Sequence, residues 1–169
     1  MMTDARGYLW RPLASADLGR VDAIARIVHA ATPECEDVLA EKRRLSPDSC
    51  FALETKAGVI GYCLAHPWMR GSVPALDAYL GAIPAAADAL HIHDVAILDE
   101  GRGLGAATSL MDLLRDAARR RSLAALTLVS IYGTSPFWRR FGFVERREAA
   151  MAAALSSYGD AVYMVAPLQ

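Results

Sequence analysis

The spacing of apolar residues changes its period several times along the chain. A short apolar run over residues 8–11 predicts an edge strand. Apolar residues then recur at helical spacing after Asp17 and again over residues 34–44, which predicts two helices. Two strand-like runs follow, over residues 50–55 and 59–65, and the Lys-Ala-Gly sequence between them predicts a hairpin.

The second half of the chain continues with strands and helices in turn. An apolar run over residues 90–98 predicts a central strand, and a glycine-rich turn at 101–105 leads into an amphipathic helix that extends to about Ala118. The remaining predicted elements are strands over 123–129, 143–147 and 161–165, a short helix over 137–140, and an Ala-rich helical link between the last two strands. This order predicts a single α/β domain over residues 1–169, with helices packed on a mixed sheet.

Residues 67–87 show no clear period. The segment is rich in Pro, Gly and Ala, which predicts a long loop with one short helix near residues 76–80. Long ordered loops often carry function, so this segment is a candidate wall of a binding site.

Composition indicates an ordinary folded protein. With 54% apolar residues, a formal charge of −1 and a pI near 6.4, the chain has no broad attraction for nucleic acid or an anionic membrane. Three widely separated cysteines without a CxxC pair argue against a disulfide framework or a structural zinc site. There is no signal-peptide pattern and no apolar run of membrane-spanning length, so we expect a cytoplasmic protein. The high apolar content is compatible with a homodimer.

The most informative stretch is the predicted strand, glycine turn and helix. The first N–H groups of such a helix have no internal acceptor and, with the helix dipole, suit a pyrophosphate. Gly101, Gly103 and Gly105 allow the backbone to approach a ligand closely, and Arg102 adds a positive charge. The spacing matches neither a P-loop nor a dinucleotide-binding turn. A turn that is purely structural is the alternative interpretation.

Two spaced motifs resemble the GNAT acetyltransferases. The turn Glu100-Gly-Arg-Gly-Leu-Gly is similar to their coenzyme A loop, Arg/Gln-x-x-Gly-x-Gly/Ala, although Glu100 replaces the usual Arg or Gln. The run Ser135-Pro-Phe-Trp-Arg-Arg-Phe-Gly-Phe is similar to their late Phe-Tyr-x-x-x-Gly-Phe element. The resemblance implies a mostly antiparallel sheet of about six to seven strands, splayed between its two central strands. It also implies an N-acetyltransferase in which a primary amine attacks acetyl-CoA directly.

The same resemblance implies which residues contact acetyl-CoA. Backbone groups of the central strand would follow the pantetheine arm, and one of their N–H groups would polarise the thioester carbonyl. The implied contacts are Val95, Ala96, Ile97, Arg102, Gly103, Leu104, Gly105, Ala106, Ser130 and Phe137. No metal is expected.

His91 and His93 are candidates for the base that deprotonates the amine. They stand two apart on the predicted strand, and histidine titrates near neutral pH. The run His-Ile-His-Asp-Val-Ala-Ile resembles the His-x-His-x-Leu-Ala-Val strand of arylalkylamine N-acetyltransferases, where both histidines are implicated in proton removal. Two core histidines, or a metal pair without a third ligand, are the alternatives. Asp94 is expected on the opposite face, and His29 and His66 have no evident partner.

The acid that protonates the leaving thiolate is less evident. Trp138 stands where the family often has tyrosine, and indole cannot supply a proton. Tyr132 is therefore the candidate acid, with Tyr158 as an alternative. Glu100 and Trp138 also leave open a different function class, a non-catalytic acyl-CoA-binding or regulatory domain.

The acceptor is expected to be a small-molecule or peptide amine. Its site is expected between the two N-terminal helices and the loop over residues 67–87. That loop carries Trp68, Arg70, Asp77 and Tyr79, a mixture that suits an aromatic amine but is equally compatible with a plain surface loop.

Overall fold

The computed structural model describes residues 7–168. The strands are β1 (Tyr8–Pro12), β2 (Phe51–Thr55), β3 (Gly58–Trp68), β4 (Ala89–Ile97), β5 (Ala125–Ser130), β6 (Val144–Glu145) and β7 (Val162–Pro167). The α-helices are α1 (Leu18–Val28), α2 (Glu36–Leu45), α3 (Ala106–Arg120), α4 (Ser135–Arg139) and α5 (Ala152–Ser156), and short 3₁₀ turns cover 15–17, 47–49, 99–101 and 149–151.

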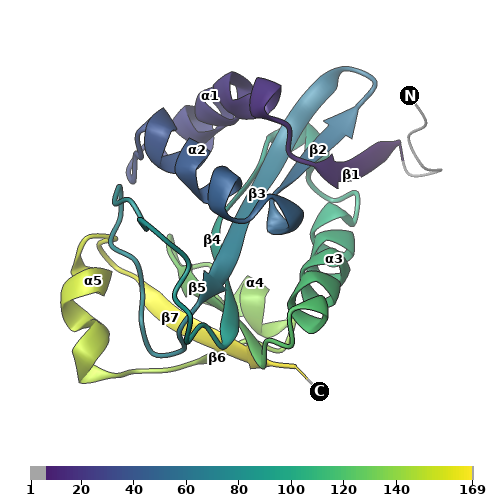
Figure 1. The fold of residues 1–169 in the computed structure, drawn as a ribbon. Coiled ribbons are helices and arrows are strands. Elements are labelled where there is room, and N and C mark those ends of the chain that lie inside the picture. The colour runs from purple at the N-terminus through teal and green to yellow at the C-terminus, as the bar shows by residue number, and fades with distance from the viewer. Residues whose placement is uncertain (1–6, 169) are drawn as a thin grey trace.

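The strands form one sheet in the order β1-β2-β3-β4-β5-β7-β6 (Figure 1). Every neighbouring pair is antiparallel except β4 and β5, which are parallel. The predicted mixed, mostly antiparallel sheet is therefore confirmed.

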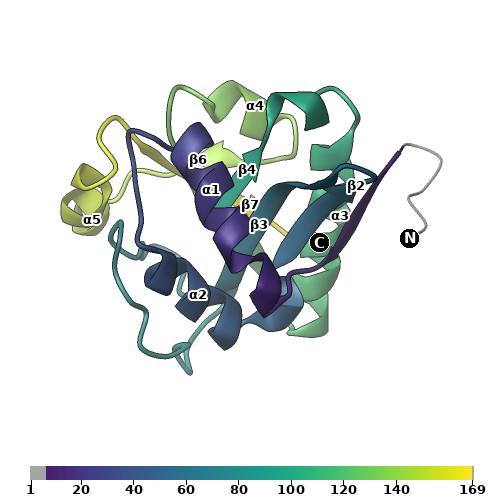
Figure 2. The same cartoon turned by 90° about the horizontal axis from the view of Figure 1, so that it is seen from above.

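Helices cover both faces of the sheet, with α1 and α2 on one side and α3 on the other (Figures 1 and 2). The apolar stripe of α3 explains its position, because Leu110 and Leu114 are buried in the core between this helix and the strands. On the opposite face, α1 buries Val21 and Ile24 and α2 buries Leu39. The same face is continued by α5, whose preceding residue Met151 packs into a third apolar cluster.

The two central strands separate partway along their length. The register of β4 and β5 starts at Ala89 with Ala125 and ends at Ile92 with Leu128. Residues 93–97 of β4 remain paired to β3, but within the described chain no β5 residue is paired with them. A gap therefore opens between β4 and β5 at the end of the sheet where α3 begins, as the resemblance implied.

β4 contains one more residue than β3 at the point where this gap begins. Leu64 lies opposite Asp94 but Ala65 lies opposite Ile92, so His93 is the extra residue of a β-bulge. Regular alternation predicted that Asp94 points away from the histidines, and this prediction was wrong. The bulge shifts the alternation by one residue and brings Asp94 to the face that carries α1 and α2.

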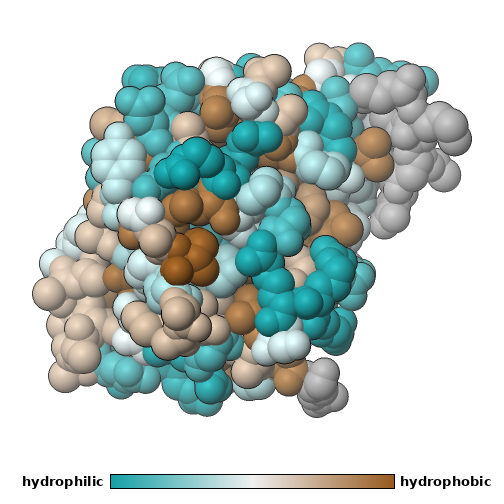
Figure 3. All heavy atoms as spheres, viewed as in Figure 1, coloured by the Kyte–Doolittle hydropathy of each residue, from teal (hydrophilic) through white to brown (hydrophobic). Residues whose placement is uncertain are grey.

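Residues 69–88 are ordered without regular secondary structure and cross between α2 and α5. The helix predicted near residues 76–80 does not form. The backbone N–H groups of Leu80 and Gly81 donate to the Glu41 carboxylate of α2, at 2.7 and 3.0 Å, instead of to local carbonyls. Apolar residues gather on the surface between α2 and α5, with hydrophilic residues around them (Figure 3).

Candidate active site

Two cavities meet beside residues 93–97 of β4, the part of this strand that is not paired with β5. The larger, of about 820 Å³, lies between β4, the N-terminus of α3, and α4, and we call it the α3 cavity. The smaller, of about 280 Å³, lies between the α1–α2 segment and residues 76–77; carboxylates line it, and we call it the acidic chamber. Both are lined by the same five residues, which we call the junction: His29, His93, Asp94, Val129 and Ile131.

The glycine turn and the N-terminus of α3 form one end of the α3 cavity. Gly103 and Gly105 have φ angles of +75° and +79°, a backbone conformation that strains residues with a Cβ. Because α3 begins at Ala106, its first N–H groups have no intrahelical acceptor and lie at the positive end of the helix dipole. This end of the cavity fits the pyrophosphate of coenzyme A.

Most of the residues expected to contact acetyl-CoA line the α3 cavity. They are Val95, Ile97, Arg102, Gly103, Gly105, Ala106 and Phe137. Ala96 is buried on the face of α1 and α2 and Leu104 is exposed, and neither residue lines the cavity. Ser130 is buried, and its hydroxyl group is hydrogen-bonded to those of Thr134 and Ser135.

Aromatic side chains line the other end of the α3 cavity. Trp138 packs edge to face on Phe137, with ring centroids 5.0 Å apart, and serves as an apolar wall. Tyr132 lines the cavity just after β5 and has a φ of +55°. Its hydroxyl group lies 2.7 Å from Thr32 Oγ1, and its ring stacks on His29. These two contacts hold Tyr132 in an uncommon backbone conformation at the mouth of the site.

His93 lies at the junction, and its side chain is fully buried. Its Nε2 is 2.8 Å from Oε1 and 3.1 Å from Oε2 of Glu34, in the segment between α1 and α2. Its Nδ1 is buried and has no hydrogen-bond partner among the described residues. A carboxylate at Nε2 favours the tautomer with the proton on that nitrogen, which leaves the lone pair of Nδ1 as a proton acceptor.

Glu34 remains ionised in spite of its burial. Burial raises the pKa of its carboxyl group, but the charges of His93 and Lys42 and the hydrogen bond to His93 outweigh burial and lower this pKa. The Lys42 ammonium is itself fully buried beneath α2, 4.0 Å from Glu34. Glu34 therefore gives the junction a fixed negative charge next to His93.

His29 forms the second carboxylate–histidine pair of the junction. Its Nε2 lies 2.7 Å from Asp94 Oδ1, while Asp94 Oδ2 accepts a hydrogen bond from Tyr62 at 2.5 Å. Burial opposes the charged form of His29, but the hydrogen bond and charge of Asp94 raise its pKa above the ordinary value of 6.5. The pairing with Asp94 therefore favours the protonated form of His29 and makes it a weaker proton acceptor. This partner could not be predicted from the sequence, because α1 and β4 meet only in the fold.

His91 lies in the protein interior, away from both cavities. It is 1% exposed, its Nδ1 is 3.0 Å from Thr127 Oγ1, and neither cavity is lined by it. Burial and the neighbouring His66 lower the pKa of His91 well below the ordinary range. His66 is also buried, and burial lowers its pKa to about 3. Both are neutral interior groups, with the His66 ring 5.9 Å from that of His93.

Four carboxylates line the acidic chamber: Asp22, Glu34, Asp77 and Asp94. Arg26 stands at its mouth with a side chain that is 74% exposed, and it pairs with Asp22 at 2.7 Å. The apolar part of the lining consists of Ala25, Pro33, Leu39, Leu76, Val129 and Ile131. The chamber is therefore negatively charged with an apolar wall.

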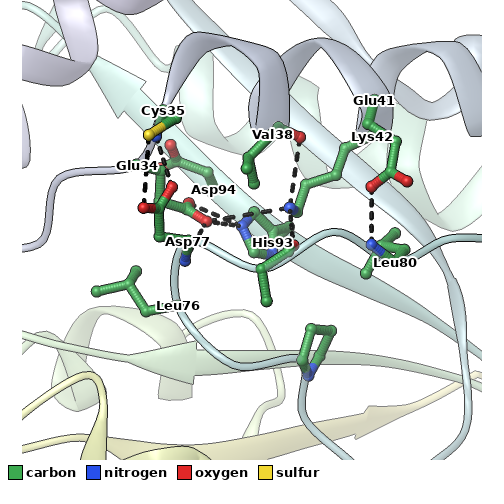
Figure 4. A network of polar contacts seen from close by, with 12 residues as sticks. Glu34, Cys35, Val38, Glu41, Lys42, Leu76, Asp77, Leu80, His93 and Asp94 are labelled. Carbon is green, nitrogen blue, oxygen red and sulfur yellow. Dashed lines mark hydrogen bonds and ion pairs between the residues drawn. The ribbon is translucent and has the colours of Figure 1, made fainter.

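Asp77 is the member of the predicted loop set that lines the chamber, whereas Trp68, Arg70 and Tyr79 line neither cavity. It has a φ of +55°, and its Oδ1 accepts a hydrogen bond from the backbone N–H of Cys35 at 2.6 Å. Its own N–H donates to Glu34 Oε2 at 3.0 Å (Figure 4). Neither a role for Glu34 nor this contact between distant segments was predicted from the sequence.

Among residues 7–168, no three His, Cys, Asp or Glu side chains are grouped in a way that could hold a metal ion. No helix within that range has the length and apolar character needed to cross a bilayer. Cys50 and Cys63 are buried free thiols, while Cys35 is an exposed one in the lining of the chamber.

Solved structures share this fold. Ard1 from Thermoplasma volcanium is 17% identical with a TM-score of 0.74, over 96% of this chain and 99% of that chain. The ribosomal-protein-S18-alanine N-acetyltransferase from Escherichia coli is 16% identical with a TM-score of 0.67, over 96% and 94% of the two chains. The GNAT-like decarboxylase GphF, in complex with isobutyryl-CoA, is 16% identical with a TM-score of 0.75, over 95% and 100%. At these identities the likeness shows the fold alone.

Sequence comparison identifies the family. No curated protein sequence matches the chain. The family model described as the acetyltransferase (GNAT) family matches residues 21–143, which is well over half of the chain. The match extends from α1 through the glycine turn to the late aromatic motif, and so includes most of the residues that line both cavities. The chain therefore belongs to the GNAT acetyltransferase family.

Proposed function

We propose that the protein is an N-acetyltransferase that transfers an acetyl group from acetyl-CoA to a primary amine within a ternary complex. The junction is the observation that carries this proposal. The α3 cavity fits coenzyme A, and it meets the acidic chamber at His93, so a thioester and an amine can be held next to each other.

Direct attack by the amine is favoured over a covalent enzyme intermediate. Cys35 lines the chamber but not the α3 cavity, so its thiol is not positioned beside the cofactor. The hydrogen bond and charge of Asp77 raise the pKa of this thiol, which keeps it protonated and weakly nucleophilic.

His93 is the proposed base. Acetyl-CoA, when bound, supplies a thioester carbonyl that an unprotonated amine can attack. Nδ1 of His93 takes the proton of the amine, and Glu34 holds the imidazole and stabilises the positive charge that it gains. We assign this role to His93 alone, because His91 is buried and lines neither cavity.

Two further groups complete the proposed site. A backbone N–H in residues 95–97, where β4 is not paired to β5, would polarise the thioester carbonyl. Tyr132 lines the α3 cavity, and its hydroxyl group, positioned by Thr32, would donate a proton to the leaving thiolate. Arg102 and the N-terminus of α3 would hold the pyrophosphate.

A thiol-release assay with acetyl-CoA and a panel of amines tests this function, with calorimetry of coenzyme A binding in parallel. We expect amine-dependent release that is lost in His93→Ala, while that variant still binds coenzyme A. Binding of coenzyme A without release for any amine would favour the alternative, a non-catalytic acyl-CoA-binding domain. Absence of coenzyme A binding would contradict both functions.

A further inference from the structure

One carboxylate of the acidic chamber has no ion-pair partner. Asp22 pairs with Arg26, and Asp94 pairs with His29. Glu34 lies against His93 and Lys42. Asp77, in contrast, forms no ion pair within the described chain.

Asp77 forms no ion pair within the described chain, and the only cation that acts on its charge from nearby is the buried Lys42 ammonium of α2. Its carboxylate bonds only to the neutral N–H and thiol groups of Cys35, at 2.6 and 3.5 Å. These contacts fix the position of the carboxylate without neutralising it. A cation of the ligand would therefore gain a full charge-assisted hydrogen bond at this point.

A second polar group faces the chamber from its buried end. His93 lines the chamber with a fully buried side chain, and its Nδ1 has no hydrogen-bond partner among the described residues. A buried nitrogen without a partner is costly unless a ligand supplies the missing hydrogen bond. The lining of the chamber thus includes a buried nitrogen that has no hydrogen-bond partner among the described residues and an exposed carboxylate that forms no ion pair with them.

The two groups belong to one hydrogen-bonded unit. Glu34 accepts a hydrogen bond from the Asp77 backbone N–H and also holds His93, while the next residue, Cys35, donates to the Asp77 carboxylate (Figure 4). The distance between the anion and the base is therefore set by adjoining residues of the chain. This arrangement suits a ligand with two nitrogens at a fixed separation.

The rest of the lining argues against the other acceptor classes. The carboxylate of an amino acid would meet four carboxylates, and the one arginine of the lining is already paired at the mouth. Trp68 and Tyr79, which had suggested an aromatic amine, lie outside the lining. A volume of about 280 Å³ is at or below the lower end of typical ligand pockets, which is small for several residues of a peptide.

We propose that the acceptor is a short aliphatic diamine, with one nitrogen at His93 and a second ammonium group paired with Asp77. This inference rests on the proposed acetyl transfer and names the substrate class of the same site. The apolar wall that includes Leu76 and Ile131 would contact the methylene groups between the two nitrogens.

Asp77→Asn tests the cation site with little change of structure. Asparagine can still accept the hydrogen bond of Cys35 N–H, and it tolerates the positive φ of this position. The assay compares kcat/KM for putrescine, for butylamine, which lacks the second nitrogen, and for γ-aminobutyrate, which carries a carboxylate there. Asp116→Asn, on the exposed side of α3, is the matched control.

We expect the wild-type protein to favour putrescine over butylamine by about tenfold or more, the range of one charge-assisted hydrogen bond. Asp77→Asn should lose this preference, through a lower kcat/KM for putrescine and a nearly unchanged value for butylamine. Equal use of both amines by the wild-type protein, or preferred use of γ-aminobutyrate or a peptide N-terminus, would overturn the inference and leave the proposed function intact.

A failure of the proposed function gives a different result. If no amine releases thiol, calorimetry of putrescine with the coenzyme A-loaded protein decides between the remaining outcomes. Putrescine binding that is weakened in Asp77→Asn would support the cation site and overturn the acetyltransferase. Absence of putrescine binding would overturn both.

Discussion

Glu34→Gln is the substitution that separates catalysis from cofactor binding most sharply. Gln is nearly isosteric with Glu, and its amide oxygen can still accept a hydrogen bond from Nε2 of His93, so the imidazole keeps its position. The negative charge is lost. The substitution therefore tests whether catalysis depends on the charge of Glu34 when His93 gains a proton.

The contact distances allow the size of the effect to be estimated. Glu34 lies 2.8 Å from His93, and hydrogen bonds to charged groups contribute about 1.5–3 kcal/mol. Because this charge matters most when His93 is protonated, we expect kcat to fall by about ten- to hundredfold. Lys42, fully buried 4.0 Å from Glu34, loses a partner, so the free energy of unfolding should also fall by about 1–3 kcal/mol.

The assay measures kcat, KM for the amine and Kd for coenzyme A, with urea denaturation to establish folding. Glu34 lines the chamber but not the α3 cavity, so the Kd for coenzyme A should stay unchanged. Glu36→Gln, an exposed substitution in the first turn of α2, is the control and should keep wild-type kcat. A folded Glu34→Gln protein with wild-type kcat would refute the role that we give to this carboxylate.

Three further predictions follow from the site. His93→Ala should lower kcat by at least about a hundredfold. His91→Ala removes an interior side chain that is bonded to Thr127 and lines neither cavity, so it should cost about 1–3 kcal/mol of unfolding free energy with a much smaller fall in kcat. Equal falls in kcat for the two variants, each shown by denaturation to be folded, would contradict this. Gly105→Ala should lower the free energy of unfolding by about 1–2 kcal/mol, because Gly105 has a φ of +79°. The same substitution should weaken coenzyme A binding, measured by calorimetry. An unchanged Kd would mean that the pyrophosphate binds elsewhere. Because the pKa of His29 is raised, its charged form stabilises the fold below pH 6.5, and this contribution is lost as the pH rises through the folded-state pKa. The difference in unfolding free energy between the wild-type protein and His29→Gln, measured by urea titration, should therefore shrink from about pH 6 to about pH 9. A difference that grows with pH would contradict the pairing with Asp94.

The sequence pattern was sufficient for much of the fold and for one half of the site. The strands, α3 and the glycine turn were predicted because each has a local apolar period or a local backbone requirement, as at Gly103 and Gly105. The α3 cavity depends on these local features. It also depends on the separation of β4 from β5, which came only from the family resemblance.

The acidic chamber could not be predicted in the same way. Glu34 was predicted only as the first residue of a helix, and its contact with His93 joins residues that are 59 positions apart. The register of β3 and β4 decides where Asp94 points, and a register cannot be read from one strand alone. The backbone N–H groups around Asp77 donate to side chains far away in the sequence, that of Leu76 to Ser157 and that of Asp77 to Glu34.

The proposed base, His93, is the one residue of the β-bulge in β4 that has no partner in β3. Leu64 and Ala65 are consecutive, and their partners Asp94 and Ile92 would also be consecutive in a regular ladder if His93 were absent. The loss of this single residue would keep every neighbouring side chain on its present face and would restore an uninterrupted antiparallel pairing. In this protein the proposed base is in effect an insertion in the pairing of β3 with β4. Proteins with this fold can therefore gain or lose the base through the insertion or deletion of one residue in β4, without repacking the apolar side chains on either face of the sheet.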